Sequence, residues 1–420
     1  MSWFDGAGLG MFVHWDHASQ QGLEISWPLV GGVFAIPAAQ KDVTVEQYQS
    51  SARTFDPREW DAAELARRAR AAGMTYAVFT AKHHAGHAMF HTELSDFSIE
   101  HTPFGRDIVA EFTDAMREEG LRVGIYFSLS DWHHADYPPF TEADKPYTLG
   151  FSPPLGTDQQ HAAYLAFLKG QLTELLTKYG RIDLLWFDGG WERRREWWRP
   201  DELERLIRGL QPDILINDRL AGVGDFTTPE QFIPPSPPDG RWETCMTMNE
   251  SWGHNPSDTR WKSARHLVHS LCEVTAKGGN LLLNVSPTGT GALPGAQVER
   301  LGEMARWMEL HGESVRGVRP GLAPWQFYGP STRTADGSRV YLHVLARPYE
   351  AVTVRGVPVK RITAARAIGS GIDLTWQTRT SVIDMLNADP SGEVMIEVPE
   401  HALDPTATVI ALDFEGGVTL

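Results

Sequence analysis

The sequence predicts an α/β protein: an irregular (β/α)8-like TIM barrel followed by a small antiparallel β-sandwich domain. Nearly continuous apolar runs of strand length recur between residues 10 and 287. Such runs are typical of strands buried on both faces, as parallel strands covered by helices are. The segments between them have helical spacing and often end at glycine. Beyond residue 320 the pattern changes to short alternating segments separated by glycine and proline, which is typical of antiparallel strands.

Each predicted barrel element can be placed on the chain. The strands are expected at 10–15, 75–83, 121–128, 182–189, 213–219 and 280–287. The helices are expected at 59–73, 105–120, 161–180 and 293–315, and the first three end at Gly73, Gly120 and Gly180, a residue that favours helix termination. Repeated helix–glycine–strand units favour a closed barrel. An open doubly wound sheet stays an alternative, because the pattern does not reveal strand order.

Two further regions complete the organisation. Proline-rich segments at 131–156 and 227–243 follow predicted strands, and long loops in compact domains are commonly functional. Alternating segments at 338–346, 350–369, 373–379 and 392–400 predict the sandwich. We therefore expect a catalytic barrel domain over residues 1–320 and a β-sandwich domain over residues 321–420.

Composition excludes several classes of function. The chain has 420 residues, with 38 Lys and Arg against 54 Asp and Glu, a net charge of −16. A nucleic-acid or anionic membrane partner requires a basic face, so neither is expected. Only Cys245 and Cys272 are present, which excludes a disulfide framework. The chain shows neither a signal-peptide pattern nor a membrane-spanning apolar run, so we expect a cytoplasmic protein. The sequence sets no oligomeric state.

Polar and aromatic residues gather where the predicted strands end, which is where barrels place their active sites. The residues at or beyond these ends are His14, His83, His84, Tyr126, Trp186, Asp188, Arg219, Glu230, Glu243 and Trp252. Histidines can bind hydroxyl groups, flat rings can pack on an apolar face, and carboxylates can act as acid and base. A sugar offers all of these features, so the set predicts a carbohydrate site.

Asp188 is the most informative of these residues. It follows a run of apolar residues and precedes two glycines. A carboxylate at the end of a buried strand is costly unless it is paired or used in chemistry. It could instead cap the following helix. The functional interpretation is a nucleophile or a metal ligand.

The histidines raise the alternative of a metal site. Zinc requires about three protein ligands at defined spacing. Adjacent residues on a strand point to opposite faces, which would separate His83 from His84. The chain contains no HExxH and no CxxC motif. We expect no metal and no cofactor, while a two-histidine, one-carboxylate site stays an alternative.

Several motifs together resemble one enzyme family. They are GMFVHW, YAVFTAKHH, GLRVGIYFS, LLWFDGGW, INDR followed by TTPEQ, RWETCMTMNESWGHN and KGGNLLLNVSPTGTG, in this order over residues 8–315. The sequence in this region resembles the retaining α-L-fucosidases of glycoside hydrolase family twenty-nine. The resemblance implies an irregular (β/α)-barrel followed by a β-sandwich, removal of terminal α-L-fucose from a fucosylated oligosaccharide or glycoconjugate, and no cofactor.

The resemblance also implies residue roles. Asp188 matches the nucleophile, and Glu230 matches the general acid/base of several members. Glu243 competes for the acid/base role and could instead bind the sugar. Residues that match fucose-binding positions are His14, His83, His84, Tyr126, Trp186, Arg219 and Trp252. Glu46 lies near a segment that supplies another carboxylate in some members.

The sequence departs from the family pattern at a few positions. Asp16 replaces the usual glycine after His-Trp and is followed by His17, and Ala85 and His87 replace the usual aspartate and phenylalanine after the His pair. These departures leave open which group attached to the fucose the protein prefers. Two alternatives therefore remain, a catalytically weak sugar-binding protein and a retaining glycosidase for a fucose-like sugar.

Overall fold

The computed structural model describes residues 2–29, 43–137 and 156–418. Within them, a curled parallel sheet has the strand order β5-β4-β3-β2-β1-β7-β6. Its strands are β1 (Leu9–Val13), β2 (Tyr76–Lys82), β3 (Arg122–Ser128), β4 (Leu184–Asp188), β5 (Leu215–Ile216), β6 (Glu243–Thr247) and β7 (Asn280–Val285). All the pairs in this sheet are parallel, so the ends of its strands share one edge. The predicted TIM-like fold class is confirmed.

An irregular segment closes the gap between β5 and β6. Asn217, just beyond β5, forms a parallel bridge with Phe226. The next residue, Thr227, bridges Trp242, and Glu230 bridges Cys245 of β6. Residues 226–230 therefore lie where a further barrel strand would run between β5 and β6, although they form no regular strand.

The barrel strands are buried on both faces, as their apolar runs predict. Alternate residues pack inside the barrel, including Phe12, Val78 and Leu184. Their strand neighbours, such as Met11 and Phe79, pack outward in a larger core with the helices. Because side chains alternate along a strand, this double burial requires apolar residues at nearly every position.

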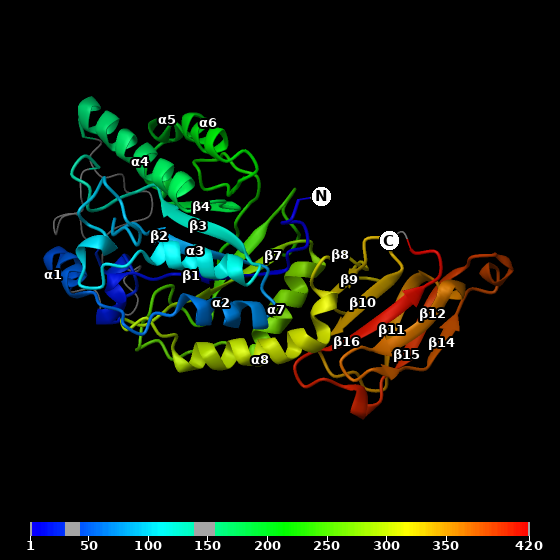
Figure 1. Cartoon of the computed structure of the whole chain (residues 1–420). Helices are drawn as coiled ribbons and strands as arrows, with labels where there is room; N and C mark the ends of the chain where they lie inside the picture. Colours follow the sequence, from blue (N-terminus) through cyan, green and yellow to red (C-terminus); the bar gives the residue numbers. More distant parts are fainter. Residues whose placement is uncertain (1, 30–42, 138–155, 419–420) are drawn as a thin grey trace.

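Helices surround the parallel sheet (Figure 1). Their bounds are α1 (Val45–Ser50), α2 (Ala62–Ala71), α3 (Ile108–Glu118), α4 (Asp158–Lys178), α5 (Arg195–Trp198), α6 (Pro200–Leu210), α7 (Ala264–Ala276) and α8 (Gly295–His311). The side chains of Asp61, Asp107 and Thr157 cap α2, α3 and α4. The glycines predicted to end these helices have positive φ angles of 78°, 72° and 67°.

The structure corrects several predicted elements. Strand β6 and helices α6 and α7 were not predicted, and the strand expected at 213–219 is only two residues long. The segment 227–243 is no simple loop, because its start bridges β6. Of the other proline-rich segment, residues 138–155 lie outside the described residues.

The C-terminal part forms two antiparallel sheets, in agreement with the predicted β domain. The larger has the order β13-β12-β16-β10-β9-β8, and the smaller β11-β15-β14. Their strands are β8 (Arg319–Pro320), β9 (Ser331–Arg333), β10 (Arg339–Val344), β11 (Ala351–Pro358), β12 (Ile362–Ala367), β13 (Ile372–Asp373), β14 (Trp376–Arg379), β15 (Ser391–Glu397) and β16 (Thr408–Phe414). Apolar residues of both sheets share one core.

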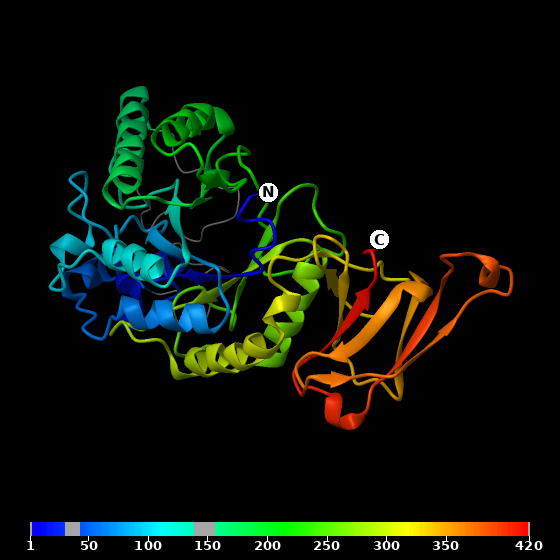
Figure 2. The ribbon, with the colours of Figure 1, turned by 45° about the vertical axis from the view of Figure 1, so that its right-hand side comes forward.

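The antiparallel sheets lie beside the barrel, on the side of α7 and α8 (Figures 1 and 2). Trp307 of α8 donates through Nε1 to the carbonyl of Ala407 at 2.9 Å. His269 of α7 contacts the carbonyl of Thr406 at 2.9 Å. The division of the chain at residues 320 and 321 stays a prediction. Within the described residues, every helix falls short of the length or apolar character needed to cross a membrane.

Close packing inside the barrel gives a stability prediction. Gly10 of β1 pairs with Tyr76, and a Cβ atom at position 10 would lie 2.4 Å from the Tyr76 ring. We expect Gly10→Ala to lower the free energy of unfolding by about 1–3 kcal/mol, the usual cost of overpacking. Thermal denaturation of the purified protein measures the effect.

Gly209 of α6 provides the matched control, because no atom lies within 4 Å of a Cβ built there. Gly209→Ala should raise stability by up to about 1 kcal/mol, since alanine is the better helix former. Equal shifts for the two variants would contradict the packing described here.

Candidate active site

A pocket of about 460 Å³ opens at the carboxyl ends of the barrel strands. Its walls come from residues near the carboxyl ends of β1 and β4, from residues that follow β1, β2, β4, β5 and β6, and from the segment that closes the barrel. The lining residues are Phe12, His14, Glu24, Trp27, His83, Trp186, Asp188, Trp191, Arg219, Glu230, Gln231, Glu250 and Trp252. Most of the predicted site residues therefore share one pocket.

Asp188 is the last residue of β4 and is only 7% exposed. The Tyr126 hydroxyl donates to its Oδ2 at 2.9 Å, and Nη1 of Arg219 donates to its Oδ1 at 3.0 Å. His84 Nε2 lies 3.7 Å from Oδ2. The carboxylate therefore faces the pocket and its partners. The short helix that follows has Gly189 at its N-cap position and no side-chain cap.

Arg219 joins the two predicted catalytic carboxylates. Its Nη1 binds Asp188, and its Nη2 lies 2.8 Å from Oε2 of Glu230. Its guanidinium also lies over the Trp186 ring, 4.5 Å from the centroid, and Nε donates to Thr228 Oγ1 at 3.0 Å. Burial would lower the pKa of Arg219, but the two carboxylates outweigh it and hold the pKa above its usual range.

The segment that closes the barrel positions Glu230. The amide of Gln231 donates to the carbonyl of Cys245 at 2.9 Å, and the amide of Cys245 donates to Pro229. The Gln231 side chain also binds Thr247 of β6. These bonds attach the segment to β6 on both sides of Glu230. The Glu230 side chain is 39% exposed, so it faces the open part of the pocket.

Each of the three histidine rings is held through Nδ1 by a different side chain. The Nδ1 atom of His14 lies 2.7 Å from Oδ1 of Asn284, that of His83 lies 2.6 Å from Oγ of Ser26, and that of His84 lies 2.7 Å from Oγ of Ser128. Burial lowers the pKa of His14 and of His84 to about 3, and lowers that of His83 well below its usual value. All three rings are therefore neutral near pH 7.

Aromatic rings form the apolar part of the site. Tyr126 stacks on Trp186 with 5.6 Å between centroids, and on His83 with 5.4 Å. Trp252 packs against His14 at 4.8 Å. Tyr126 thus combines two functions, since its ring supports these neighbours while its hydroxyl binds Asp188. Burial raises the pKa of Tyr126, so the hydroxyl stays a donor.

Glu243 lies in the barrel interior and not in the pocket wall. It is the first residue of β6, is fully buried inside the barrel and is not among the pocket-lining residues. It accepts hydrogen bonds from the Tyr76 hydroxyl and, at 3.1 Å, from Nε1 of Trp186. Burial raises the pKa of Glu243 to about 7. The structure therefore places this carboxyl group behind Trp186.

The expected separation of His83 from His84 is wrong. β2 ends at Lys82, so the two histidines lie beyond the pleated strand and their rings are only 4.2 Å apart. Ligand atoms of His83, His84 and Asp188 all lie within 4.8 Å of one another. A metal ion would fit this set by distance, but Arg219 already places a positive charge on Asp188.

Sequence reasoning missed six lining residues. They are Phe12, Glu24, Trp27, Trp191, Gln231 and Glu250. Glu24 is 3% exposed, accepts hydrogen bonds from the amides of Trp252 and Gly253 at 2.6 and 3.0 Å, and has a pKa raised by burial to about 8. Gln231 follows Glu230 in the sequence, and Trp191 lies three residues after Asp188. This closeness to predicted site residues was the signal that could have identified them.

Comparisons with known proteins agree with this geometry. A sequence model of the family described as alpha-L-fucosidase matches residues 1–313. The tissue alpha-L-fucosidase of Mus musculus is 29% identical, in a match that covers 98% of this chain and 90% of the mouse protein. The human tissue alpha-L-fucosidase is 28% identical over 97% of this chain and 86% of its own length.

Solved structures extend the similarity to the whole fold. Alpha-L-fucosidase isoenzyme 1 from Paenibacillus thiaminolyticus is 33% identical with a TM-score of 0.81, covering 98% of both chains. An alpha-L-fucosidase of glycoside hydrolase family 29 from Bacteroides thetaiotaomicron, solved as a trapped covalent intermediate, is 25% identical with a TM-score of 0.81, covering 98% of this chain and 94% of its own. The chain therefore belongs to the alpha-L-fucosidase family.

Proposed function

We propose that this glycoside hydrolase is a retaining exo-α-L-fucosidase, which removes terminal α-L-fucose from fucosylated glycans through a covalent glycosyl-enzyme. One observation carries the proposal. Arg219 contacts Asp188 at 3.0 Å and Glu230 at 2.8 Å in a pocket that also contains neutral histidines and tryptophans. Retaining glycosidases use two close carboxyl groups, one as nucleophile and one as acid/base.

Asp188 is the proposed nucleophile. Its carboxylate attacks the anomeric carbon of fucose and forms an ester, while the bond to the leaving oxygen breaks. Glu230 gives its proton to that oxygen. In the second step, Glu230 takes a proton from water, which attacks the anomeric carbon and releases Asp188. The buried position of Asp188 and the more exposed position of Glu230 suit attack from within and proton exchange with solvent.

Arg219 matches the charge changes of this cycle. The proposed mechanism requires an ionised Asp188 and a protonated Glu230 before attack. In the ester intermediate, Asp188 is neutral and Glu230 is ionised. A guanidinium that contacts both groups therefore has one negative partner at each stage. Since opposite charge favours the ionised form, Arg219 stabilises the nucleophile first and the general base afterwards.

The remaining pocket residues suit a deoxy sugar. Neutral imidazoles can donate to or accept from ring hydroxyls, and His14 and His83 line the pocket. The buried Nε2 atom of His84, which no described residue hydrogen-bonds, lies beside Asp188. Trp186 and Trp252 offer flat surfaces for the methyl group and the apolar face of fucose. We propose His14, His83, His84, Trp186 and Trp252 as fucose-binding residues, and Tyr126 as the donor that orients Asp188.

Between the two candidate acids, the contacts favour Glu230. Glu230 borders the pocket and shares Arg219 with Asp188. Glu243 faces the barrel interior, where Tyr76 and Trp186 occupy its oxygens. We propose that Glu243 positions Trp186, on which Arg219 lies.

A second candidate function is metal-dependent hydrolysis, favoured by the clustering of His83, His84 and Asp188 ligand atoms within 4.8 Å. The charge balance opposes it, because a cation bound there would lie close to the guanidinium that contacts Asp188 at 3.0 Å.

The nucleophile can be tested directly. Asp188→Gly should lower kcat on a chromogenic aryl α-L-fucoside by at least ~10³-fold, because no group remains to form the ester. Azide should partly restore the rate by attacking in its place. A near-wild-type rate would show that Asp188 is not the nucleophile. A wild-type protein that binds fucose but hydrolyses no fucoside would favour the sugar-binding alternative.

The acid/base assignment predicts a dependence on the leaving group. Glu230→Ala should lose little kcat/KM on aryl fucosides with good leaving groups and much more on poor ones, since kcat/KM reports the first step and only poor leaving groups require protonation there. Glu243→Gln is the matched control and should affect all leaving groups alike. Steady-state kinetics over a series of substituted phenyl fucosides provides the measurement. A reversal of the two patterns would transfer the role to Glu243.

The metal alternative predicts sensitivity to chelation, whereas the proposed mechanism predicts none. After dialysis against EDTA, kcat/KM on the aryl fucoside should stay within about twofold of the untreated value. Metal analysis of the same sample supplies the control. A large loss that added divalent cation restores would favour the metal-dependent mechanism.

A further inference from the structure

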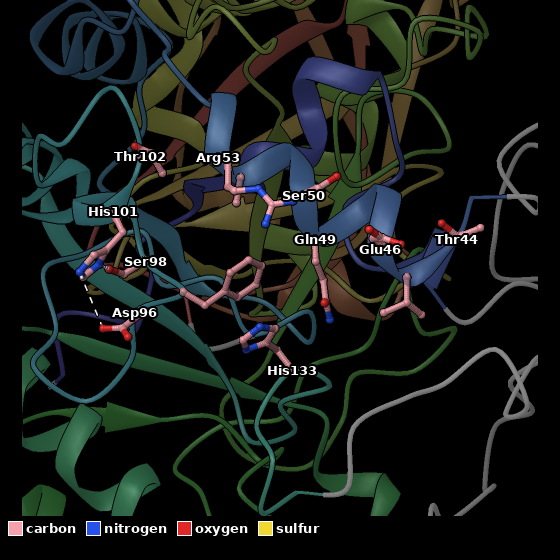
Figure 3. Close-up of a pocket in the computed structure, with 13 residues that line it drawn as sticks. Thr44, Glu46, Gln49, Ser50, Arg53, Asp96, Ser98, His101, Thr102 and His133 are labelled. Atoms are coloured by element: carbon pink, nitrogen blue, oxygen red, sulfur yellow. Dashed lines mark hydrogen bonds and ion pairs between the residues drawn. The ribbon is translucent and has the colours of Figure 1, made fainter.

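A second pocket, of about 760 Å³, lies outside the one that contains Asp188 (Figure 3). Three chain segments form it: α1 with the turn after it, the loop at residues 96–102, and His133. These segments follow β1, β2 and β3, respectively. The second pocket therefore lies at the same end of the barrel as the first.

One wall of the second pocket carries polar groups that no described residue engages. Glu46 and Gln49 of α1 and Arg53 after it have side chains without a hydrogen bond or ion pair within the described part of the chain. In Figure 3 the Gln49 side chain extends from α1 toward the side that carries His133. This wall thus offers an acceptor, an amide and a donor to a ligand.

The opposite wall carries an aromatic surface. The His133 ring stacks on Phe97 with 4.1 Å between centroids and an angle of 15°. His133 is exposed. On the inner side, Phe97 makes edge-to-face contacts with the rings of His17 and His87, with 5.6 and 5.0 Å between centroids. Two of the residues that distinguish this sequence from its family pattern therefore lie behind this surface.

A buried ion pair fixes this wall before any ligand binds. Oδ1 of Asp131 accepts from the amides of His133 and His134 at 3.0 Å each, and Oδ2 accepts from Lys82 Nζ at 3.1 Å. Lys82 and Asp131 are both almost fully buried. A surface held in this way loses little conformational entropy on binding.

Within the described residues, two neighbouring tryptophans connect the linings of the two pockets. Trp27 lines the first pocket and lies 5.9 Å, between centroids, from Trp132. Trp132 precedes His133, which lines the second pocket. The two pockets are therefore neighbours at one end of the barrel, so different sugar residues of one glycan could occupy both.

We propose that the second pocket binds a neutral pyranose of the glycan that carries the fucose, through stacking on His133 and hydrogen bonds with Glu46, Gln49 and Arg53. The proposal rests on the proposed fucosidase function. Its charges disfavour an anionic ligand, because the carboxylates of Glu46 and Asp96 outnumber the guanidinium of Arg53, and desolvation lowers the pKa of the His133 ring. Pairs of donors and acceptors beside a flat ring match the hydroxyls and apolar face of a pyranose.

Paired substrates test the proposal. kcat/KM is measured for the wild-type chain, Arg53→Ala, His133→Ala and the double variant, on an aryl α-L-fucoside and on a panel of fucosylated oligosaccharides and N-glycans. For the best glycan, each single variant should lose about five- to tenfold, as expected for one hydrogen bond or ring contact. The aryl fucoside cannot reach the second pocket, so its kcat/KM should change less than twofold.

Arg205→Ala and His401→Ala, at exposed positions outside both pockets, are the matched controls and should leave both substrates unchanged. Thermal denaturation checks that every variant is folded. Equal losses on both substrates, or no loss on any glycan, would overturn the proposal. So would a wild-type chain that cleaves the aryl fucoside but no member of the panel. Failure to cleave the aryl fucoside would instead contradict the proposed fucosidase function.

Discussion

The contact of one guanidinium with two carboxylates is the constraint on which the site depends. Asp188 ends a buried strand, where an unpaired charge would be costly. Arg219 offsets that cost by forming an ion pair with Asp188, and it also contacts Glu230. Its position depends in turn on Trp186 beneath it, whose indole donates to Glu243. A chain of contacts therefore links the barrel interior to the proposed chemistry.

The irregular closure of the barrel follows from the same requirement. A regular strand between β5 and β6 would alternate its side chains between the interior and the helix layer. The segment at 226–230 instead bridges both neighbours at single residues, and Glu230 emerges from it toward Arg219. The departure from ideal barrel geometry thus occurs where the proposed acid/base must be presented, as is common at functional sites.

The sequence supported much of this account, for identifiable reasons. Continuous apolar runs located most barrel strands, and residues at their ends, such as His14 and Asp188, line the pocket. Strand β6 was missed because its short run, Glu243–Thr247, begins with a carboxylate and contains threonines. Glu24 was missed because it contributes from a loop, where no periodicity marks the direction of a side chain. The burial of Glu243 depends on Tyr76, more than 160 residues away, and local patterns carry no such information.

The most direct test of the account is to identify the residue that forms the covalent intermediate. The chain is incubated with 2-deoxy-2-fluoro-fucosyl fluoride, which slows release of the sugar ester, then digested and analysed by mass spectrometry. The account predicts one fluorofucosyl group per chain, on the peptide that contains Asp188 and absent when Asp188 is substituted. A label on a different carboxylate, or steady turnover of fucosides by an enzyme that never becomes labelled, would contradict it.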